Sequence, residues 1–302
     1  MMISIVIPVY NGAESLEELY DRIKEVMGKK GLDFEIIMVD DFSRDESYKM
    51  MCRLREKDKR VKLIRLAFNS GQHNATLCGM RYCSGDYVIT MDDDLQHPPE
   101  EIVKLIDKIE EGYDIVFGIA EDKKHSFYRN LGNRLIDKSL NVIYDKPPDL
   151  KVSSFRIIRK GLAELLSNCK RKEIYLAGLI FENTSNTACI KVKHDARKYG
   201  RSNYSIKKAA RLALNLVFNH SDLPLKITVF IWLVFFTVLS IASVLLFVAP
   251  MKYFFDKLAF IILWFLTLLN LLSFLVTARY IKGLRREMLN DKPPYEIKEL
   301  QL

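Results

Sequence analysis

The stretch Met91-Asp-Asp-Asp-Leu-Gln-His-Pro-Pro99 decides the fold to be expected of this chain. It follows the apolar run 87–90, so three acidic residues come directly after a predicted buried strand. Side chains at a strand end project from the edge of a sheet, and packing in a core therefore does not explain the acids. Asp92 and Asp94 would point the same way along an extended chain. The pattern predicts a site that opens at the carboxyl edge of a sheet.

Two close carboxylates repel each other, and a cation between them removes that repulsion. Oxygen ligands of this kind suit Mg²⁺ or Mn²⁺, which commonly also take phosphate oxygens from a substrate. Asp92 and Asp94 are therefore candidate metal ligands in an enzyme that handles a nucleotide diphosphate. The alternative is a solvated acidic loop. The strand before the acids and Pro98-Pro99 after them, where a helix can begin, favour the metal site.

The first two thirds of the chain alternate between strand and helix patterns. Continuous apolar runs, typical of strands buried on both faces, predict strands at 4–9, 34–39, 61–66, 86–91 and 114–118. Ser43 and Glu46 predict a capping box that begins a helix reaching about Asp58. Such alternation is typical of an α/β domain with a mostly parallel sheet. Ligands of such sheets bind at the carboxyl ends of the strands, where Tyr10-Asn11, Asp40-Asp41 and the three aspartates lie.

Several classes of function are disfavoured. No G-x-G-x-x-G follows the first strand and no G-x-x-x-x-G-K-[ST] occurs, which disfavours dinucleotide-dependent hydride transfer and P-loop chemistry. The net charge of +8 is modest and clustered, so no nucleic-acid partner is expected. The five cysteines contain no C-x-x-C pair, which favours reduced thiols facing the cytosol over disulfides or a zinc site. No cleaved signal peptide is expected at the start.

Two apolar stretches predict a membrane anchor. Residues 227–249 and 258–278 contain no Asp, Glu, Lys or Arg. At about 1.5 Å per residue, each can cross a hydrocarbon core of about 30 Å, with a turn at 250–257 between them. A helical hairpin buried in a soluble core is the alternative, but such helices rarely lack a polar face over this length. Basic residues flank the pair at 191–211 and 279–286, so both termini are expected to be cytoplasmic, in an inner (plasma) membrane.

Two basic segments have more than one interpretation. Residues 195–219 have an amphipathic pattern, with Ile206 and Leu214 on one face and Lys207 and Arg211 on another. A helix lying in the interface and attracted to anionic membrane lipid is favoured over a linker helix packed on the catalytic domain. Residues 122–141, just after the fifth predicted strand, form either a solvated helix face or a phosphate-binding loop.

Seven motifs, taken together, are highly specific. They are Ile5-Val-Ile-Pro-Val-Tyr-Asn11, Val39-Asp-Asp-Phe-Ser-Arg-Asp45, Asn69-Ser-Gly-Gln-His-Asn-Ala75, Asp92-Asp-Asp-Leu-Gln-His-Pro-Pro-Glu100, Phe155-Arg156, Arg197-Lys-Tyr-Gly-Arg-Ser-Asn-Tyr204 and Lys292-Pro-Pro-Tyr295. With them the chain resembles, over essentially its whole length, the family-two glycosyltransferases that load a sugar onto a polyprenyl phosphate. These include dolichyl-phosphate mannose synthase, the bactoprenol glucosyltransferases and the undecaprenyl-phosphate aminoarabinose-type transferases. Gly71-Gln-His73 looks most like the last branch.

The resemblance implies a GT-A fold, which is Rossmann-like, and a role for each matching residue. It implies that the nucleotide sugar is bound by Pro8, Tyr10, Asn11, Asp40, Asp41, Gln72 and Asp93. It implies that Mg²⁺ or Mn²⁺ is bound by Asp92, Asp94 and Gln96. It implies that the acceptor and the phosphates are bound by Arg129, Arg134, Arg197, Ser202 and Tyr204, and that the catalytic set is Asp92, Asp94, Arg129, Ser154 and Arg156. A homo-oligomer is expected, because many relatives assemble as tetramers.

The expected organisation has four parts. They are a cytoplasmic GT-A catalytic domain at 1–195, a juxtamembrane interfacial helix at 196–224, two transmembrane helices within 225–281 and a cytoplasmic tail at 282–302. The chain departs from the family at three positions, with Gly12 where Glu is frequent, Gln72 where several members have Lys, and Ser154 where some bacterial relatives carry Asp as a proposed base. The catalytic base is therefore unassigned.

The expected reaction moves a sugar from a nucleotide-diphosphate sugar, with UDP favoured, to polyprenyl (undecaprenyl) phosphate by a single inverting displacement. A phosphomonoester, whose second pKa is about 6, is mostly ionised at neutral pH and needs little help from a base. The enzyme must then supply positioning and cations that offset phosphate repulsion. One alternative is a polysaccharide-building family-two transferase with a sugar hydroxyl as acceptor. Another is a non-catalytic membrane scaffold that retains the nucleotide-sugar fold.

Overall fold

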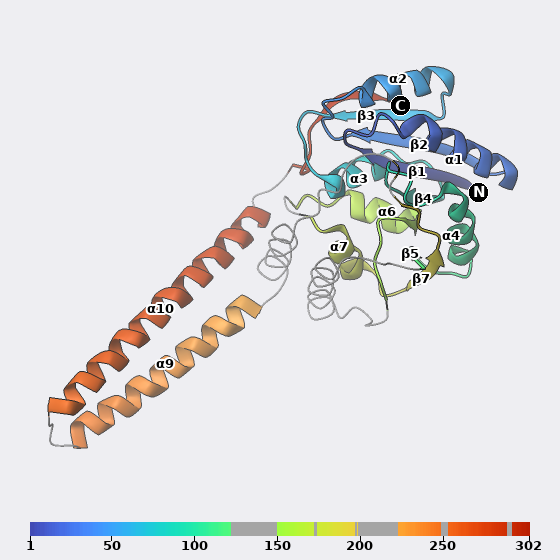
Figure 1. Ribbon diagram of the computed structural model, residues 1–302. Coiled ribbons are helices and arrows are strands. Elements are labelled where there is room, and N and C mark those ends of the chain that lie inside the picture. Colours follow the sequence, from blue (N-terminus) through green and yellow to red (C-terminus); the bar gives the residue numbers. More distant parts are fainter. Residues whose placement is uncertain (122–149, 172–173, 197, 199–222, 249–252, 289–291) are drawn as a thin grey trace. The chain divides into compact units, whose positions relative to one another are not determined.

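The computed structural model describes residues 1–121, 150–171, 174–196, 198, 223–248, 253–288 and 292–302 (Figure 1). The chain forms two compact units, one made of 1–206 with 290–302 and the other of 207–289. Five predicted phosphate or acceptor residues lie outside the described residues: Arg129, Arg134, Arg197, Ser202 and Tyr204. Almost all of the amphipathic helix predicted at 195–219 lies outside them too.

The first unit is built on one eight-stranded sheet, in the order β7-β5-β6-β4-β1-β2-β3-β8. The strands are β1 Met2–Val9, β2 Asp33–Asp40, β3 Val61–Leu66, β4 Tyr87–Thr90, β5 Ile115–Ala120, β6 Arg156–Arg159, β7 Thr187–Val192 and β8 Ile297–Gln301. Parallel pairing joins β1 to β2 and β4, β2 to β3, and β5 to β7. Only β6 and β8 run the other way, antiparallel to the strands beside them. This confirms the predicted α/β fold with a mostly parallel sheet.

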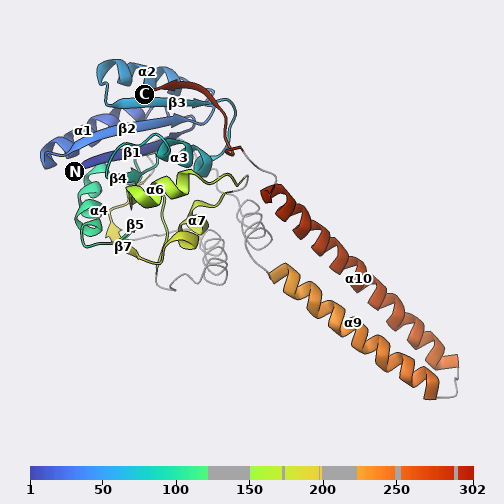
Figure 2. The same ribbon diagram turned by 180° about the vertical axis from the view of Figure 1, so that it is seen from behind.

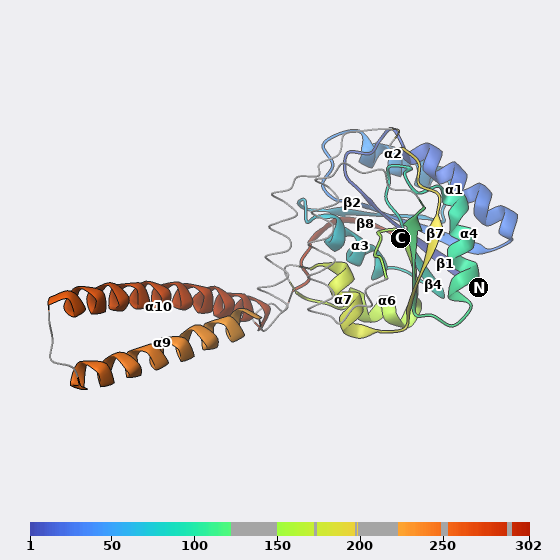
Figure 3. The same cartoon turned by 60° about the horizontal axis from the view of Figure 1, so that its bottom comes forward.

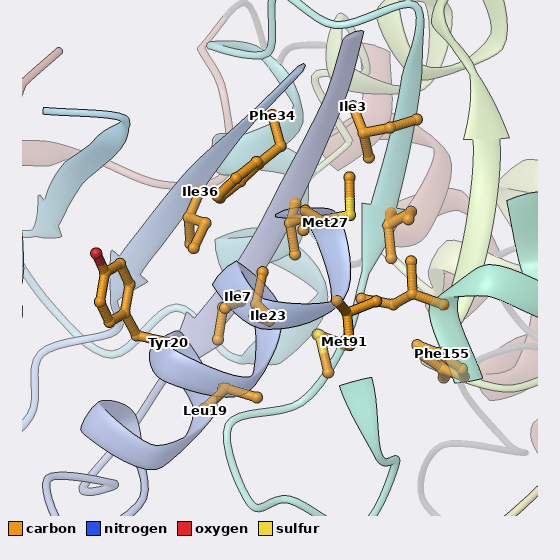
Figure 4. Close-up of a cluster of buried hydrophobic side chains, with 14 of the residues drawn as sticks. Ile3, Ile7, Leu19, Tyr20, Ile23, Met27, Phe34, Ile36, Met91 and Phe155 are labelled. Carbon is orange, nitrogen blue, oxygen red and sulfur yellow. The ribbon is translucent and has the colours of Figure 1, made fainter. Parts of the chain in front are cut away.

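Helices cover both faces of the sheet (Figures 1 and 2). They are α1 Leu16–Lys30, α2 Ser47–Lys57, α3 Gln72–Met80, α4 Ile102–Ile109, α6 Lys160–Ser167 and α7 Leu176–Asn183, with a 3₁₀ turn at Pro99–Glu101. Alternate strand residues face opposite layers: Ile5 and Ile7 pack with α1 and α4, whereas Val6 packs with α3, α6 and α7. Figure 4 shows the first of these two clusters, where Ile23 and Met27 of α1 lie against the strands. Burial on both faces explains why the strands appear in the sequence as unbroken apolar runs.

The capping box predicted at Ser43 is wrong. The helix α2 begins at Ser47 and has no side-chain cap at Glu46. The Ser43 hydroxyl instead accepts a hydrogen bond from the Asn11 backbone N–H at 3.0 Å, and the Ser43 N–H donates to Asp40 Oδ1 at 2.9 Å. Ser43 thus joins the loops that follow β1 and β2, and the helix starts one turn later than its sequence pattern suggests.

The segment predicted as a tail, 282–302, is not a separate element. Its first residues continue a helix, and Ile297–Gln301 forms β8, which pairs antiparallel with β3 at the edge of the sheet. Glu299 fixes this strand through a 2.6 Å hydrogen bond from the Tyr48 hydroxyl and a 3.5 Å contact with Arg65. The residues after the apolar helices therefore complete the first unit, because the exposed edge of β3 offers unpaired backbone groups to the chain end.

The second unit contains two antiparallel helices, α9 Leu223–Val248 and α10 Tyr253–Met288 (Figure 3). The apolar windows Pro224–Ile241 and Trp264–Lys282 are each long enough to cross a membrane. Both windows are mostly exposed, with 11% of each buried within the structure, which is unlike the core helix of a soluble domain. The last part of the turn predicted at 250–257 is helical, since α10 already begins at Tyr253, and α10 runs on through the basic residues 279–286.

Candidate active site

The loops after β1, β2 and β4 meet at the carboxyl edge of the parallel strands. The chain enters β6 at the same edge, because β6 runs antiparallel to β4 and Arg156 is paired with Thr90. A cavity of about 200 Å³ opens here. It is lined by Pro8 of β1, by the first turns of α3, by Thr90 to Asp92, by the segment 152–156 and by the start of α7. Most of the predicted catalytic residues that the structure describes lie on this cavity.

Asp92 is held by two side chains. Its Oδ1 accepts a hydrogen bond from Gln72 Nε2 at 2.6 Å, and its Oδ2 accepts one from the Ser154 hydroxyl at 2.8 Å. A carboxylate oxygen has two lone pairs, so accepting one hydrogen bond does not by itself prevent it from binding a cation. Ser154, where some relatives carry a proposed base, is therefore a donor that fixes Asp92 in this chain. The structure brings together the predicted residues Gln72, Asp92, Ser154 and Arg156.

The acidic loop is a turn and not the extended chain that was predicted. Asp93 and Asp94 form the turn, and Leu95 adopts a left-handed conformation with φ of 60°. Asp94 Oδ1 accepts a hydrogen bond from the Gln96 backbone N–H at 3.1 Å, which closes the turn. The reversal is needed because the chain must leave the strand and enter the 3₁₀ turn at Pro99 within eight residues.

Asp93 points toward the loop after β1. Its Oδ2 accepts a hydrogen bond from the Tyr10 N–H at 3.4 Å. Burial, followed by the negative charges of Asp92 and Asp94, raises the pKa of Asp93 to about 7. A Cβ at Gly12 would lie 2.3 Å from the same Oδ2, so the space that a larger residue would need at position 12 is occupied by the Asp93 carboxylate. The departure at Gly12 therefore has a structural reason in this chain.

Asp40 and Asp41 are both buried, at 0% and 3% exposure. Both Asp41 oxygens are used by the loop before α3, accepting from the Ser70 N–H at 2.6 Å and the Gly71 N–H at 2.9 Å. Burial raises the pKa of Asp41, while these two hydrogen bonds act in the opposite direction. Gly71 has a φ of 87°, which favours glycine. Asp41 thus positions the Gly71-Gln72-His73 turn, and its predicted contact with the nucleotide base stays a prediction.

The remaining predicted nucleotide contacts lie on the loop after β1. Tyr10 is 44% exposed and open to a ligand. Asn11 has a positive φ of 55°, and its side-chain oxygen accepts a hydrogen bond from the Arg44 N–H at 2.8 Å. Pro8 lines the cavity. These residues are placed on one edge with Asp93, but no contact in the structure assigns them to a nucleotide.

The residues of the cavity that the sequence analysis missed include His73, Thr90 and Tyr175. The Thr90 hydroxyl donates to the Ser154 carbonyl at 2.6 Å and accepts from Arg156 Nε at 3.1 Å. The His73 ring meets the Tyr175 ring edge-on, with 5.3 Å between the centroids. Burial and the nearby Arg156 charge lower the pKa of His73 to about 4, so the imidazole is neutral at pH 7. Gly71-Gln-His73 was recognised as a motif, but nothing local indicated that α7 would cover it.

The donor set suits a divalent cation. Asp92 and Asp94 are separated by one residue, Asp93, whose pKa is raised by burial and then by these two neighbours. The three carboxylates make a crowded site whose repulsion a cation would relieve. Among the described residues, no group of three or more His, Cys, Asp and Glu side chains is arranged to hold a metal. Asp92 and Asp94, with Gln96 beside them, would therefore hold a cation only together with oxygens from substrate or water, as Mg²⁺ and Mn²⁺ sites commonly do.

The chain matches the family model described as glycosyl transferase family 2 over residues 4–166, more than half of its length. The chain belongs to glycosyl transferase family 2. The predicted recognition of a family-two glycosyltransferase, and with it the enzyme class, is confirmed. The matched region begins with β1 and ends within α6, so it includes the acidic loop, the Gly71-Gln-His73 turn and Arg156.

This glycosyltransferase is similar to curated proteins that act on a lipid phosphate. It is 34% identical over 225 residues to the undecaprenyl-phosphate 4-deoxy-4-formamido-L-arabinose transferase of Enterobacter sp. (strain 638), covering 74% of this chain and 69% of that one. It is also 34% identical over 231 residues to the transferase of the same name from Pseudomonas paraeruginosa (strain DSM 24068 / PA7), covering 75% of this chain and 67% of that one.

Solved structures show the same fold. The glycosyltransferase is similar to glucosyl-3-phosphoglycerate synthase from Mycobacterium tuberculosis, crystallised with Mn²⁺, UDP and glucosyl-3-phosphoglycerate. The TM-score is 0.55 and the identity 17%, with 72% of this chain and 77% of that chain covered. The likeness confirms the predicted GT-A fold.

Proposed function

We propose that this glycosyltransferase moves a sugar from a nucleotide-diphosphate sugar, with UDP as the expected nucleotide, to polyprenyl (undecaprenyl) phosphate. The observation that carries the proposal is the Asp92–Asp94 pair, fixed at the carboxyl edge of the sheet by Gln72, Ser154 and the closing turn. Such a pair suits the cation that accompanies a diphosphate leaving group. The named relatives make a 4-formamido pentose the first sugar to test.

Mg²⁺ or Mn²⁺ would be held by Asp92 and Asp94, with Gln96 as the third expected ligand. When bound, the cation supplies positive charge to the diphosphate that leaves. The chain's own residues do the rest: Gln72 and Ser154 orient the Asp92 carboxylate, and the loop after β1 holds Asp93 through the Tyr10 N–H. Rigid positioning of this kind is what a displacement with an already ionised nucleophile needs.

Ser154 is not a general base. Its hydroxyl donates to Asp92, and within the described residues no carboxylate takes the place of the base that some relatives carry there. A phosphate acceptor does not require one, because a phosphomonoester is already mostly dianionic at neutral pH, its second pKa being about 6. A sugar hydroxyl, the acceptor of a polysaccharide-building transferase, would require one. This contrast favours the lipid phosphate.

The two apolar helices support a membrane location. We propose that α9 and α10 span the inner membrane and that the catalytic domain and both termini are cytoplasmic, as the flanking basic residues suggest. A homo-oligomer, with a tetramer expected, belongs to the same proposal. Light scattering of the protein in detergent and labelling of cysteines introduced at 250–252 and at the C-terminus measure these two properties.

The direct test incubates the full-length protein in nanodiscs with radiolabelled UDP-4-formamido-arabinose, undecaprenyl phosphate and Mn²⁺. The expected product partitions into organic solvent and releases the sugar on mild acid treatment. A labelled polymer that stays in the aqueous phase would show the polysaccharide-building reaction instead. Failure of the protein to bind UDP at any concentration of Mg²⁺ or Mn²⁺ would favour a non-catalytic scaffold and refute the proposal.

A further inference from the structure

Three charged side chains, one each on β2, β3 and β8, form a row across neighbouring strands of the sheet. Asp40 is paired in register with Arg65, and Arg65 is paired in register with Glu299 of the C-terminal strand. Arg65 Nε lies 3.3 Å from Asp40 Oδ2, and Arg65 Nη1 lies 3.5 Å from Glu299 Oε1. In this charged row a single guanidinium faces two carboxylates, one at the predicted nucleotide site and one near the end of the chain.

The inner carboxylate of the charged row, Asp40, depends on Arg65. Asp40 is 0% exposed. Its Oδ2 and Arg65 Nε are both sealed from solvent, and neither atom has a hydrogen-bond partner among the described residues. The attraction between the two charges is therefore what holds them together. Removal of Arg65 would leave a buried carboxylate without its counter-charge, which is costly.

The outer side of Arg65 is held by the end of the chain. Arg65 Cζ lies 4.3 Å from the centroid of the Tyr48 ring, and the Tyr48 hydroxyl donates a hydrogen bond to Glu299 Oε2 at 2.6 Å. Glu299 therefore contacts both the guanidinium and the ring on which the guanidinium stacks. Stacking and carboxylate pairing together fix the plane of an arginine side chain. Loss of the Glu299 carboxylate would release Arg65 and Tyr48 at once.

The inner end of the charged row leads into the loops at the carboxyl edge. Asp40 Oδ1 accepts a hydrogen bond from the Ser43 N–H at 2.9 Å, and the Ser43 hydroxyl accepts one from the Asn11 N–H at 3.0 Å. Asp40 thus joins the loop after β2 to the loop after β1, which carries Tyr10 and Asn11. A continuous series of contacts runs from Glu299 through Arg65 to the loops predicted to bind the nucleotide.

The loop after β2 is held in a strained conformation. Phe42 has a φ of 64°, in the left-handed region that a bulky residue rarely adopts, and it is 38% exposed. Such a conformation is costly and persists only where the surrounding structure fixes it. Asp41 on one side is held by the loop before α3, and Ser43 on the other side is held by Asp40. We expect the loop to relax when Asp40 is no longer held.

We infer that Arg65 and Glu299 are positioning residues for the nucleotide sugar. The C-terminal strand β8 holds Arg65, Arg65 holds Asp40, and Asp40 fixes the two loops in the conformation that binds the nucleotide. The inference rests on the proposed function, because it takes these loops to be the nucleotide site. The segment that follows the two apolar helices in the chain therefore contributes to donor binding as well as to the edge of the sheet.

Direct contact of Arg65 with a phosphate of the nucleotide is the competing role, and it predicts the opposite effect at Glu299. If Arg65 bound the phosphate, Glu299 would compete for the same guanidinium, and removal of the Glu299 carboxylate would tighten nucleotide binding. If Glu299 instead holds Arg65 in place for Asp40, the same substitution weakens binding. The sign of the change in affinity separates the two roles.

The experiment uses the full-length protein in nanodiscs with Mn²⁺ and UDP as the probe. Calorimetry measures the Kd and the stoichiometry of UDP binding for the wild type, Arg65→Gln, Glu299→Gln and the variant that carries both substitutions. Steady-state kinetics then measure kcat and the KM of UDP-4-formamido-arabinose. Glu296→Gln is the matched control, because it removes the same charge from an exposed side chain three residues earlier, outside the charged row.

We expect Arg65→Gln to raise the Kd of UDP by about tenfold and Glu299→Gln to raise it by about threefold, because the loops are less well ordered before the nucleotide binds. The KM of the donor should rise in parallel, with kcat and the binding stoichiometry unchanged. Since Glu299 acts through Arg65, the double variant should bind UDP no more weakly than Arg65→Gln alone. Glu296→Gln should bind UDP like the wild type.

An unchanged Kd in folded Arg65→Gln and Glu299→Gln would overturn the inference and leave both residues structural. Lower stoichiometry or lower kcat at an unchanged Kd would mean the same, because it reports fewer folded molecules and not weaker binding. Tighter binding by Glu299→Gln, or additive losses in the double variant, would also overturn it. Glu299→Gln serves alone if Arg65→Gln does not fold, since the Glu299 side chain is 41% exposed. Failure of the wild type to bind UDP would instead contradict the proposed function, so the two failures are distinguishable.

Discussion

The catalytic unit and the helical pair α9–α10 use their polar residues in opposite ways. At the carboxyl edge of the sheet, Asp92 and Arg156 both line the cavity, and among the described residues the terminal nitrogens of Arg156 have no hydrogen-bond partner. In the helical pair, Trp232 Nε1 donates to Ser273 Oγ at 2.8 Å, and the hydroxyls of Thr237 and Ser240 donate to carbonyls one turn earlier. Polar groups that can still bind a ligand lie at the proposed active site, whereas polar groups that are paired within the protein stabilise its structure.

Asp94→Ala gives the largest expected effect, because it removes one of the two carboxylates proposed to hold the cation. We expect transfer to fall by about 1,000-fold, which is about 4 kcal/mol at 1.36 kcal/mol per tenfold. The rate of lipid-linked product formation with radiolabelled donor measures it. Asp107→Ala is the control, since Asp107 pairs with Lys30 on the surface of α4. Full transfer activity of Asp94→Ala would contradict the proposed metal-binding role of Asp94. It would also contradict the contrast drawn between the catalytic unit and the helical pair.

Glu35 is a polar group of the catalytic unit whose bonds are all internal, so its loss should affect stability and not chemistry. It is 3% exposed and accepts hydrogen bonds from Ser4, from Ser84 and, as an ion pair at 2.6 Å, from Lys62. We expect Glu35→Gln to lower the free energy of unfolding by about 2 kcal/mol, because it leaves the Lys62 ammonium without its partner. Thermal unfolding in detergent measures the change, with Glu25→Gln on the surface of α1 as the control.

The pH dependence of Glu35 follows from the direction of its shift. Burial alone would raise the pKa of Glu35, but the hydrogen bonds from Lys62, Ser4 and Ser84 outweigh burial and lower it below 4.5. A depressed pKa stabilises the folded state above the ordinary value, and the contribution is lost as the pH falls through the folded pKa. The wild type should therefore lose its advantage in free energy of unfolding over Glu35→Gln as the pH falls below about 4.5. An advantage that persists at low pH would count against the ion pair.

The sequence predicted the parts of the fold that depend on local pattern. The parallel strands were found because burial on both faces leaves unbroken apolar runs, and Asp92, Ser154 and Arg156 were found by motif and shown to meet in one cavity. The strand β8 was not predicted. Its sequence, Ile297–Gln301, has weak alternation, and its pairing with β3 joins residues more than 230 positions apart. No local pattern specifies such a contact.

The same limit applies to the site. His73, Thr90 and Tyr175 come from three different elements, and only the packing of α7 against the sheet places them together. Ser43 has the sequence pattern of a helix cap, but the loop after β1 supplies a competing donor, the Asn11 N–H. Asp94 lies on a turn rather than on an extended chain, where Leu95 adopts a positive φ. No glycine stands at this position to indicate such a backbone conformation from the sequence. Predictions from the sequence fail at this site where a segment distant in the chain makes the contact that the local pattern would otherwise make.

Gly12→Ala tests whether ligand binding at the carboxyl edge of the sheet depends on the position of the Asp93 carboxylate. The new Cβ would lie 2.3 Å from Asp93 Oδ2, so the carboxylate must turn away from the Tyr10 N–H. We expect about a tenfold loss in affinity for UDP, about 1.4 kcal/mol, with little change in the melting temperature, since the carboxylate end can move. Calorimetry with UDP and Mn²⁺ measures it. Gly28→Ala in α1, whose Cβ would meet nothing within 4 Å, is the matched control.

Trp232→Phe gives the smallest expected effect and addresses the helical pair itself. The variant keeps an aromatic ring but loses the hydrogen bond from Nε1 to Ser273, whose side chain is 0% exposed. Hydrogen bonds between helices in lipid are worth about 0.6 kcal/mol on average, so we expect a loss of that order in stability and unchanged transfer. Thermal unfolding in nanodiscs measures it against Trp264→Phe, which removes an indole that is 64% exposed. An equal loss in the two variants would show that the Trp232–Ser273 bond does not stabilise the pair. A large loss of transfer in Trp232→Phe alone would show that this internally paired group also serves the chemistry, and the division between the two regions would then fail.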